Sequence, residues 1–340
     1  MRKIFFVIGT RAEAIKILPV IKELEKRKHS YVVVSSGQHD LREFKFKNFI
    51  ELNPATAKSG GFKSAFEASF FLLKAMPRLI MLLRKEKSVV IVHGDTMTTT
   101  AGALAGRLAG CIVCHLESGL RTHDLRQPFP EEASRVIADF LSQVHFASTK
   151  RAFKVTHHSS TFLVGNTVID SIKQKHLRVS DKKFVLVSVH RQENINDCAT
   201  MQKIVAKVLE ISKKHKVKWI MHGNTVRKLC EYELMHSIRS KCEVIDLMPY
   251  EKFLPLLAQS TAVLSDSGGL AEECAFLRKP LVILREKTER MESVDHGYAL
   301  LGFNFDFEEF LKKFSPDAKD IYGDGTTGIQ VVSILERISK

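Results

Sequence analysis

At 340 residues the chain is longer than one hydrophobic core usually organises, so two domains of roughly 150 residues each are expected. Its content of 44% hydrophobic and 26% charged residues, with nine Pro and 18 Gly, excludes a disordered or fibrous protein. The net charge of +14 favours anionic partners, but no basic run is interleaved with aromatic residues, so we expect no nucleic-acid partner.

Neither of the most apolar stretches fits an export signal or a membrane span. The apolar part of residues 1–16 is too short for a signal peptide. Residues 70–83 are interrupted by Lys74, Pro77 and Arg78, which predicts an amphipathic helix packed on a sheet, with a membrane-surface helix as the alternative. We therefore expect a cytoplasmic protein without a membrane partner.

The six cysteines lack the dense spacing of a small disulfide-linked domain, so reduced thiols are expected. Cys111 and Cys114 have the C-x-x-C spacing of metal and redox sites. They lie in a β-branched run typical of a buried strand, which disfavours both roles, and we predict no metal site.

Short β-rich runs alternate with helix-length segments, which predicts an α/β protein with parallel sheets. In the first half the predicted strands are residues 3–8, 30–35, 89–92, 111–116, 145–147 and 161–164, and the first helix is 12–26. In the second half the predicted strands are 184–189, 218–221, 243–246, 262–265 and 280–284, with a helix at 199–214.

The predicted boundary lies within residues 166–182, where Gly165 and a charged stretch interrupt the apolar pattern. This gives two Rossmann-like, doubly wound domains at 1–170 and 171–340, the final helix being free to pack back on the first. Two such domains facing each other would form an interdomain cleft lined by the carboxyl ends of strands, where open α/β sheets bind ligands.

The first predicted strand leads into a segment suited to an anion. Gly9, Arg11 and Lys16 lie at the start of the following helix. The helix amides, the positive end of the helix dipole and Arg11 would converge on a phosphate or carboxylate. A plain turn with a solvated Arg11 is the alternative.

Three carboxylates follow strands or loops of the same predicted sheet. Asp95 follows one strand, Glu117 follows the next, and Glu131 opens a helix. Each has a structural alternative: an N-cap for Asp95, a capping or ion-paired acid for Glu117, and a first-turn acid for Glu131. Together they would give one site several groups able to exchange protons.

The second half carries a histidine and a glycine pair at strand ends. His190 ends that half's first strand, which favours a functional role over a structural histidine. Ser267, Gly268 and Gly269 join a strand to a helix, where amides could approach a diphosphate, a flexible connector being the alternative. Glu273, one helical turn further on, is placed to accept hydrogen bonds from ribose hydroxyls.

Eight short motifs follow one another along the chain: GTRAEAIK at 9–16, HGDT at 93–96, ESGLRT at 117–122, PEE at 130–132, GNTVID at 165–170, DSGG at 266–269, TER at 288–290 and YGDG at 322–325. In this order and spacing they resemble the non-hydrolysing UDP-N-acetylglucosamine 2-epimerase family over nearly the whole chain. Eight ordered motifs are far more specific than any one of them.

The resemblance implies a GT-B fold, a homodimer and the reversible conversion of UDP-N-acetylglucosamine to UDP-N-acetylmannosamine without a metal or other cofactor, for surface polysaccharide or glycan precursors. The hydrogen at sugar C2 is not next to a ketone, so the family eliminates UDP to give 2-acetamidoglucal and adds UDP back on the other face. That path needs a base at C2, stabilisation of the departing diphosphate and a closed site.

The resemblance also implies residue roles. The implied acid/base or essential polar residues are Asp95, Glu117, Glu131 and His190, and which of them removes the proton is left open. The implied binding residues are Arg11, Lys16 and Arg135 around the substrate, Ser267, Gly268 and Gly269 at the diphosphate, and Phe253, Glu273 and Arg290 around the nucleoside.

Five positions depart from the family pattern without removing a charged group: Ala12, Ser118, Ser134, Ala271 and Met291. Residues 59–61 lack the glutamine that bacterial relatives use around a second, activating UDP-N-acetylglucosamine. The alternatives are a hydrolysing 2-epimerase, a 2-epimerase of another UDP-2-acetamido sugar, and a non-catalytic protein that binds a polyanion.

Overall fold

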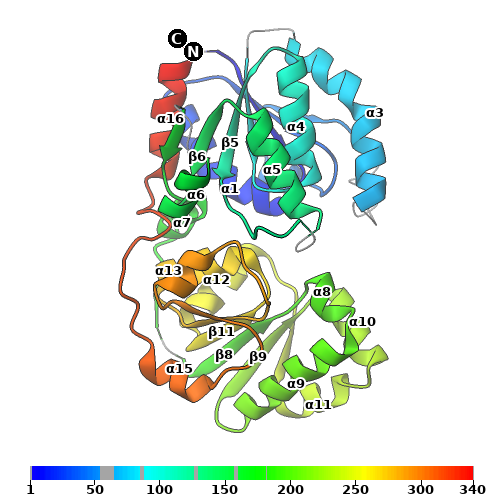
Figure 1. Cartoon of the computed structure of the whole chain (residues 1–340), viewed down its shortest axis with the longest axis vertical. Coiled ribbons are helices and arrows are strands. Elements are labelled where there is room, and N and C mark those ends of the chain that lie inside the picture. Colours follow the sequence, from blue (N-terminus) through cyan, green and yellow to red (C-terminus); the bar gives the residue numbers. More distant parts are fainter. Residues whose placement is uncertain are drawn as a thin grey trace. The chain divides into compact units, whose positions relative to one another are not determined.

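The structure, a computed structural model, describes residues 2–53, 65–84, 88–125, 129–156, 160–180 and 182–339, without the side chains of 65–74. The chain divides into unit 1, residues Met1–Gln174 and Tyr322–Lys340, and unit 2, residues Lys175–Ile321. Each unit contains one parallel sheet (Figure 1). The division between Gln174 and Lys175 lies inside the predicted interval of 166–182, and the returning segment belongs to unit 1.

The sheet of unit 1 has the strand order β3-β2-β1-β4-β5-β6-β7. Its strands are β1 Ile4–Ile8, β2 Tyr31–Ser35, β3 Phe49–Glu51, β4 Val89–His93, β5 Ile112–Ser118, β6 Val144–Ala147 and β7 Thr161–Leu163. The order reverses between β1 and β4, so the loops that follow these two strands diverge at the carboxyl edge. In open α/β sheets this reversal is the usual position of a ligand.

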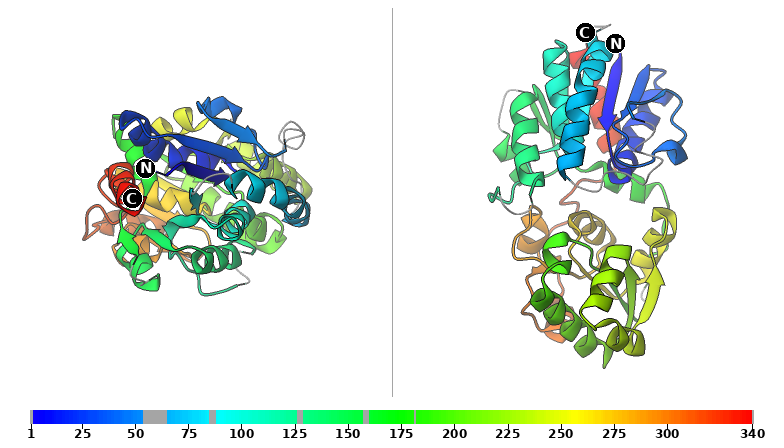
Figure 2. Two further views of the ribbon diagram at one scale, coloured as in Figure 1. Left: turned by 90° about the horizontal axis from the view of Figure 1, so that it is seen from above. Right: turned by 90° about the vertical axis from the view of Figure 1, so that its right-hand side faces the viewer.

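Helices cover both faces of this sheet because successive residues of a strand point to opposite sides. Ile4, Phe6 and Ile8 of β1 pack with the helices at Arg11–Lys26 (α1) and Thr327–Ile338 (α16), whereas Phe5 and Val7 pack with those at Ala65–Arg84 (α3) and Met97–Leu108 (α4). The helices of unit 1 are α1 Arg11–Lys26, α3 Ala65–Arg84, α4 Met97–Leu108, α5 Glu131–Leu141, α6 Lys150–Val155, α7 Thr167–Lys173 and α16 Thr327–Ile338, with a short 3-10 helix at Arg42–Phe44. β1 starts and α16 ends at the same end of unit 1 (Figure 2).

The sheet of unit 2 has the strand order β10-β9-β8-β11-β12-β13, which reverses between β8 and β11. Its strands are β8 Phe184–Ser188, β9 Lys216–Met221, β10 Glu243–Asp246, β11 Ala262–Ser265, β12 Leu281–Ile283 and β13 Ala299–Leu301. Its helices are α8 Gln192–Ile195, α9 Cys198–Ser212, α10 Gly223–Glu231, α11 Met235–Lys241, α12 Tyr250–Gln259, α13 Gly268–Leu277, α14 Met291–Asp295 and α15 Phe307–Lys313.

The predicted pair of doubly wound, parallel α/β sheets is confirmed. The amphipathic helix expected at 70–83 is α3, whose Ala75, Leu79 and Leu83 are buried in the core. Within the described part of the chain, no helix has the length and hydropathy to cross a membrane. The segment at 59–61, which lacks the glutamine that bacterial relatives use around a second UDP-N-acetylglucosamine, lies outside the described residues.

Candidate active site

The start of α1 is closed by a carboxylate of the chain itself. Thr10 and Glu13 form a capping box, in which the amides of Gly9 and Thr10 donate to Glu13 Oε2 at 2.9 and 2.7 Å. Burial raises the pKa of Glu13, and these hydrogen bonds oppose that rise. A ligand anion was predicted at this helix start, but the Glu13 side chain of the same helix occupies the position. Arg11 is exposed, and its Nε is 2.7 Å from Glu43 Oε1.

The same carboxylate joins the two loops that diverge at the strand-order reversal. Thr96 Oγ1 donates to Glu13 Oε1 at 2.9 Å, and Thr96 is also the N-cap of α4. Asp95, the preceding residue, is therefore not the N-cap, which removes the structural alternative considered for it.

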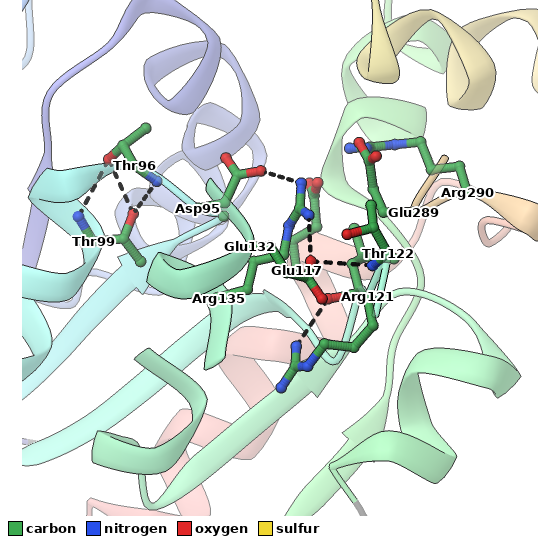
Figure 3. Close-up of polar contacts among 12 residues, drawn as sticks. Asp95, Thr96, Thr99, Glu117, Arg121, Thr122, Glu132, Arg135, Glu289 and Arg290 are labelled. Carbon is green, nitrogen blue, oxygen red and sulfur yellow. Dashed lines mark hydrogen bonds and ion pairs between the residues drawn. The ribbon is translucent and has the colours of Figure 1, made fainter. Parts of the chain in front are cut away.

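Asp95 instead pairs with Arg135, a buried residue of α5 (Figure 3). Arg135 Nη1 also donates to Glu132 Oε2 at 2.8 Å, and Glu132 accepts from the Thr122 and His123 amides at 3.1 Å each. The guanidinium is thus fixed between two carboxylates. The Asp95 side chain remains 30% exposed, so it can still reach a ligand.

Glu117 lies where the ladder between β5 and β6 shifts register between Leu116 and Ser118. Its φ of 63° is unusual for a residue other than glycine. Its carboxylate pairs with Lys16 from α1 and accepts from Asn166 Nδ2 at 3.0 Å. The two sequence-predicted residues Lys16 and Glu117 are therefore brought together at the same edge as Asp95 and Arg135.

His93, at the end of β4, has its Nε2 atom 3.5 Å from Glu117 Oε2. Burial lowers the pKa of His93 to about 4, and the charge of Glu117 only partly opposes this. A neutral imidazole therefore adjoins the Lys16–Glu117 pair at neutral pH.

Glu131, the first residue of α5, is half-buried. Its sequence neighbour Glu132 is the residue that fixes Arg135, a role that the sequence motifs did not predict. Both acids are in the PEE motif, but the sequence alone does not indicate which one turns toward Arg135.

In unit 2 a buried aspartate organises the loop that carries His190. Asp266 follows β11, is 0% exposed, and accepts from the backbone N–H groups of His190 and Arg191 at 3.0 and 2.9 Å. Asn194 Nδ2 donates to the same carboxylate at 3.0 Å. Asp266 was visible in the DSGG motif, but its role depends on β8 and β11 being adjacent, which the sequence does not state.

The His190 ring is one-third exposed and stacks on His222, with the ring centroids 4.5 Å apart. Burial lowers the pKa of His190, while Asp266, whose Oδ1 is 3.4 Å from His190 Nδ1, acts in the opposite direction. Because burial has the larger effect, His190 is neutral at pH 7 and can accept or relay a proton.

The Ser267–Gly269 turn opens α13, and the Ser267 side chain makes no capping hydrogen bond to that helix. A Cβ on Gly269 would meet no atom within 4 Å, so this backbone is approachable. A Cβ on Gly268 would lie 2.5 Å from Glu289 Oε1 and 2.7 Å from Arg290 Nη1, which explains glycine there.

The residues expected around a nucleoside are held by internal contacts. Arg290 is buried, pairs with Glu289, and its Nε donates to Glu272 Oε1 at 3.0 Å. Glu273 is buried and accepts from the Tyr250 hydroxyl at 2.9 Å, a partner that the sequence analysis did not identify. Phe253, on α12, is half-buried.

Comparison with known proteins identifies the family. Residues 22–336 match the family described as UDP-N-acetylglucosamine 2-epimerase. The UDP-N-acetylglucosamine 2-epimerase of Methanococcus maripaludis is 32% identical over 367 residues, covering 98% of both chains.

Solved structures agree. The crystal structure of the Methanocaldococcus jannaschii UDP-GlcNAc 2-epimerase, in complex with UDP-GlcNAc and UDP, has a TM-score of 0.84 at 29% identity and covers 98% of this chain and 99% of that one. The Neisseria meningitidis UDP-GlcNAc 2-epimerase bound to UDP-GlcNAc has a TM-score of 0.84 at 30% identity, covering 98% of this chain and 100% of that one. The fold is thus GT-B-like, and the chain belongs to the UDP-N-acetylglucosamine 2-epimerase family, a family of isomerases.

Proposed function

We propose that this protein interconverts UDP-N-acetylglucosamine and UDP-N-acetylmannosamine by eliminating UDP to 2-acetamidoglucal and adding it back. The observation that carries the proposal is the carboxyl edge of unit 1, where Asp95 and Glu117 are each paired with a cation of the chain. Membership of the family, whose relatives bind UDP-GlcNAc and UDP in solved structures, supports the choice of substrate.

The elimination breaks the C2–H bond, whose electron pair forms the C1–C2 double bond, and the bond from C1 to the diphosphate oxygen, whose electron pair leaves with UDP. A base takes the C2 proton, and UDP leaves with its negative charge. We assign acid/base work to Asp95, Glu117, Glu131 and His190. Lys16 pairs with Glu117 and Arg135 pairs with Asp95, so each candidate base is held in place by a cation of the chain.

We assign UDP to unit 2. The N-terminus of α13 at Ser267, Gly268 and Gly269 offers amides and a helix dipole to the diphosphate. Glu273, oriented by Tyr250, accepts from the ribose hydroxyls, and Phe253 and Arg290 contact the base. In unit 1 we assign Arg11 and Arg135 to the substrate, and no metal or nicotinamide takes part.

We also propose that the protein is a homodimer that buries the apolar face formed by α4 and α5. These helices contact each other, and their outward residues include Leu108, Ile137 and Phe140, the last 87% exposed. Phe140→Asp should convert the dimer to a monomer in sedimentation equilibrium. A wild-type protein that is monomeric at micromolar concentration would refute the proposal.

Chromatographic separation of the nucleotide sugars tests the function. Wild-type protein should convert UDP-N-acetylglucosamine into an equilibrium mixture of the two epimers, with free UDP staying at trace level and no effect of a metal chelator. Asp95→Asn and Glu117→Gln should lose turnover, whereas Glu336→Gln, at a surface ion pair of unit 1, should keep it. Free UDP accumulating as fast as substrate disappears would show hydrolysis instead.

A further inference from the structure

A buried histidine lies on β5, two residues before Glu117. His115 is 0% exposed, and both of its ring nitrogens are within hydrogen-bond distance of an oxygen atom. Nδ1 is 2.6 Å from Asp139 Oδ1 on α5, and Nε2 is 2.7 Å from the carbonyl oxygen of Gly94.

The protons of this cluster can be counted. The Gly94 carbonyl can only accept, so Nε2 must carry a hydrogen. Asp139 Oδ2 accepts from the Gly119 amide at 3.1 Å and from Arg121 Nη2 at 2.6 Å, as a carboxylate does. With Asp139 ionised beside Arg121, Oδ1 can also only accept, so Nδ1 carries a hydrogen too. No neutral tautomer of His115 satisfies both contacts.

Contacts other than His115 also favour the charged form of Asp139. Burial raises the pKa of Asp139, whereas the charge of Arg121 lowers it, and the Gly119 amide donates to the same carboxylate oxygen as Arg121. Gly119 must be glycine for its amide to reach Asp139, because its φ is +82° and a Cβ would lie 2.2 Å from the Ala152 carbonyl oxygen.

We propose that His115 is a buried imidazolium and that His115 and Asp139 are positioning residues for the two candidate acids. His115 holds the Gly94 carbonyl, one residue before Asp95, and Asp139 holds the Gly119–Arg121 turn that follows Glu117. One ion pair thereby fixes the spacing of both acids. The positioning role rests on the proposed function, whereas the charge state of His115 does not.

Other titratable groups face the pair from the neighbouring strands. His145 of β6 pairs in register with His115, and its Nδ1 is 3.7 Å from Asp139 Oδ1. His93 of β4, on the other side of β5, is neutral at pH 7 because burial lowers its pKa to about 4. Of these groups, His115 and Arg121 make the shortest contacts with the Asp139 carboxylate, each at 2.6 Å.

Nitrogen-15 NMR of histidine-labelled protein tests the charge state without reference to activity. The chain has 14 histidines, and the signal missing from a His115→Gln variant assigns His115. At pH 7.5 both ring nitrogens of His115 should show a one-bond coupling to hydrogen. A ring with one protonated and one bare nitrogen would overturn the inference, whether or not the variant is stable enough for assay.

Kinetics test the positioning role. His115→Gln should lower kcat about 100-fold, the cost typical of a displaced reacting group, and leave KM unchanged. The matched control is His29→Gln, since His29 Nε2 pairs with Glu336 Oε1 at 2.7 Å in the same unit, and it should keep the wild-type kcat. If wild-type protein forms the second epimer and His115→Gln retains its kcat, the positioning role is wrong. If wild-type protein forms no second epimer, the proposed function fails and the NMR result still stands.

Discussion

At Glu117 the backbone leaves the regular strand to present one side chain. The extra residue in β5 opposite β6 and the φ of 63° together turn the carboxylate toward Lys16 and Asn166. Bulges commonly re-aim side chains near active sites, and an unusual φ persists only where its surroundings hold it. The surrounding contacts here are the Lys16 ammonium and the Asn166 amide.

Removing the cation should leave Glu117 buried without its partner. We expect Lys16→Met to lower kcat/KM about 100-fold, equivalent to about 2.7 kcal/mol of transition-state stabilisation, because the Glu117 carboxylate loses the ammonium group that positions it. Lys26→Met, at the solvent-exposed end of the same helix, should have no effect. Steady-state turnover of both variants checks this, and wild-type turnover in Lys16→Met would contradict the assigned pair.

Gly119 should be sensitive to one added methyl group. Gly119→Ala combines a φ of +82° with a Cβ 2.2 Å from a backbone oxygen, whereas Gly110→Ala has a φ of +74° and meets no atom within 4 Å. Both variants incur a conformational cost of about 1 kcal/mol, and Gly119→Ala should lose at least a further ~1 kcal/mol to the contact. Urea unfolding measures the difference, and equal losses would show that the turn relaxes freely.

Helix α16 is attached to the rest of unit 1 by a buried carboxylate on α7. Asp170 accepts from the amides of Thr327 and Gly328 at 3.2 and 2.8 Å, and Val331, Val332 and Leu335 of α16 are buried in the core that includes α1. The carboxylate therefore satisfies amides at the helix start that would otherwise lack partners.

Asp170→Asn should loosen this helix. We expect a loss of about 1–2 kcal/mol and faster hydrogen exchange across 327–338, because the amide side chain can present only one accepting oxygen. Asp306→Asn, the matched N-cap change at α15 of unit 2, should leave exchange in α16 unchanged. Hydrogen-exchange mass spectrometry reports both, and unchanged protection of α16 in Asp170→Asn would contradict the attachment.

The elements that sequence predicted are those with long, fully buried strands. β1, β4 and β8 are apolar at every position or nearly so, and each was located within one residue at its start. β3 and β13 were missed; each has only three residues, most of them half-buried.

The residues of the candidate site were likewise predicted only in part from the sequence. The ordered motifs predicted four of its residues, which the structure places in two ion pairs at one edge of the sheet: Lys16 with Glu117, and Arg135 with Asp95. Three acids that organise the site were not assigned roles: Glu13, Glu132 and Asp266. Glu13 and Asp266 accept hydrogen bonds from groups that are distant in sequence. Glu132 accepts from a turn whose direction the sequence does not specify.

The buried neutral histidines predict how the free energy of unfolding changes with pH. The pKa of His93 is lowered by burial to about 4 in the folded protein, from 6.5. Below pH 6.5 the unfolded chain binds a proton that the folded protein does not, so stability is full above pH 6.5 and falls as the pH drops toward 4. His222, also with a pKa lowered to about 4, acts in the same direction.

The free energy of unfolding should therefore decline between pH 6.5 and 4, with His93 contributing on the order of 3 kcal/mol. A His93→Gln variant should show a shallower decline over this window. Urea unfolding at a series of pH values gives both slopes, and identical slopes would mean that His93 titrates normally in the folded protein.

The proposed function depends on elimination of UDP and its re-addition to the glucal. Proton NMR of UDP-N-acetylglucosamine incubated with the protein in heavy water tests it most directly, because a proton removed at C2 is replaced from the solvent. We predict that both epimers appear and that both carry deuterium at C2. A second epimer that retains its original hydrogen at C2, or no second epimer at all, would contradict the account.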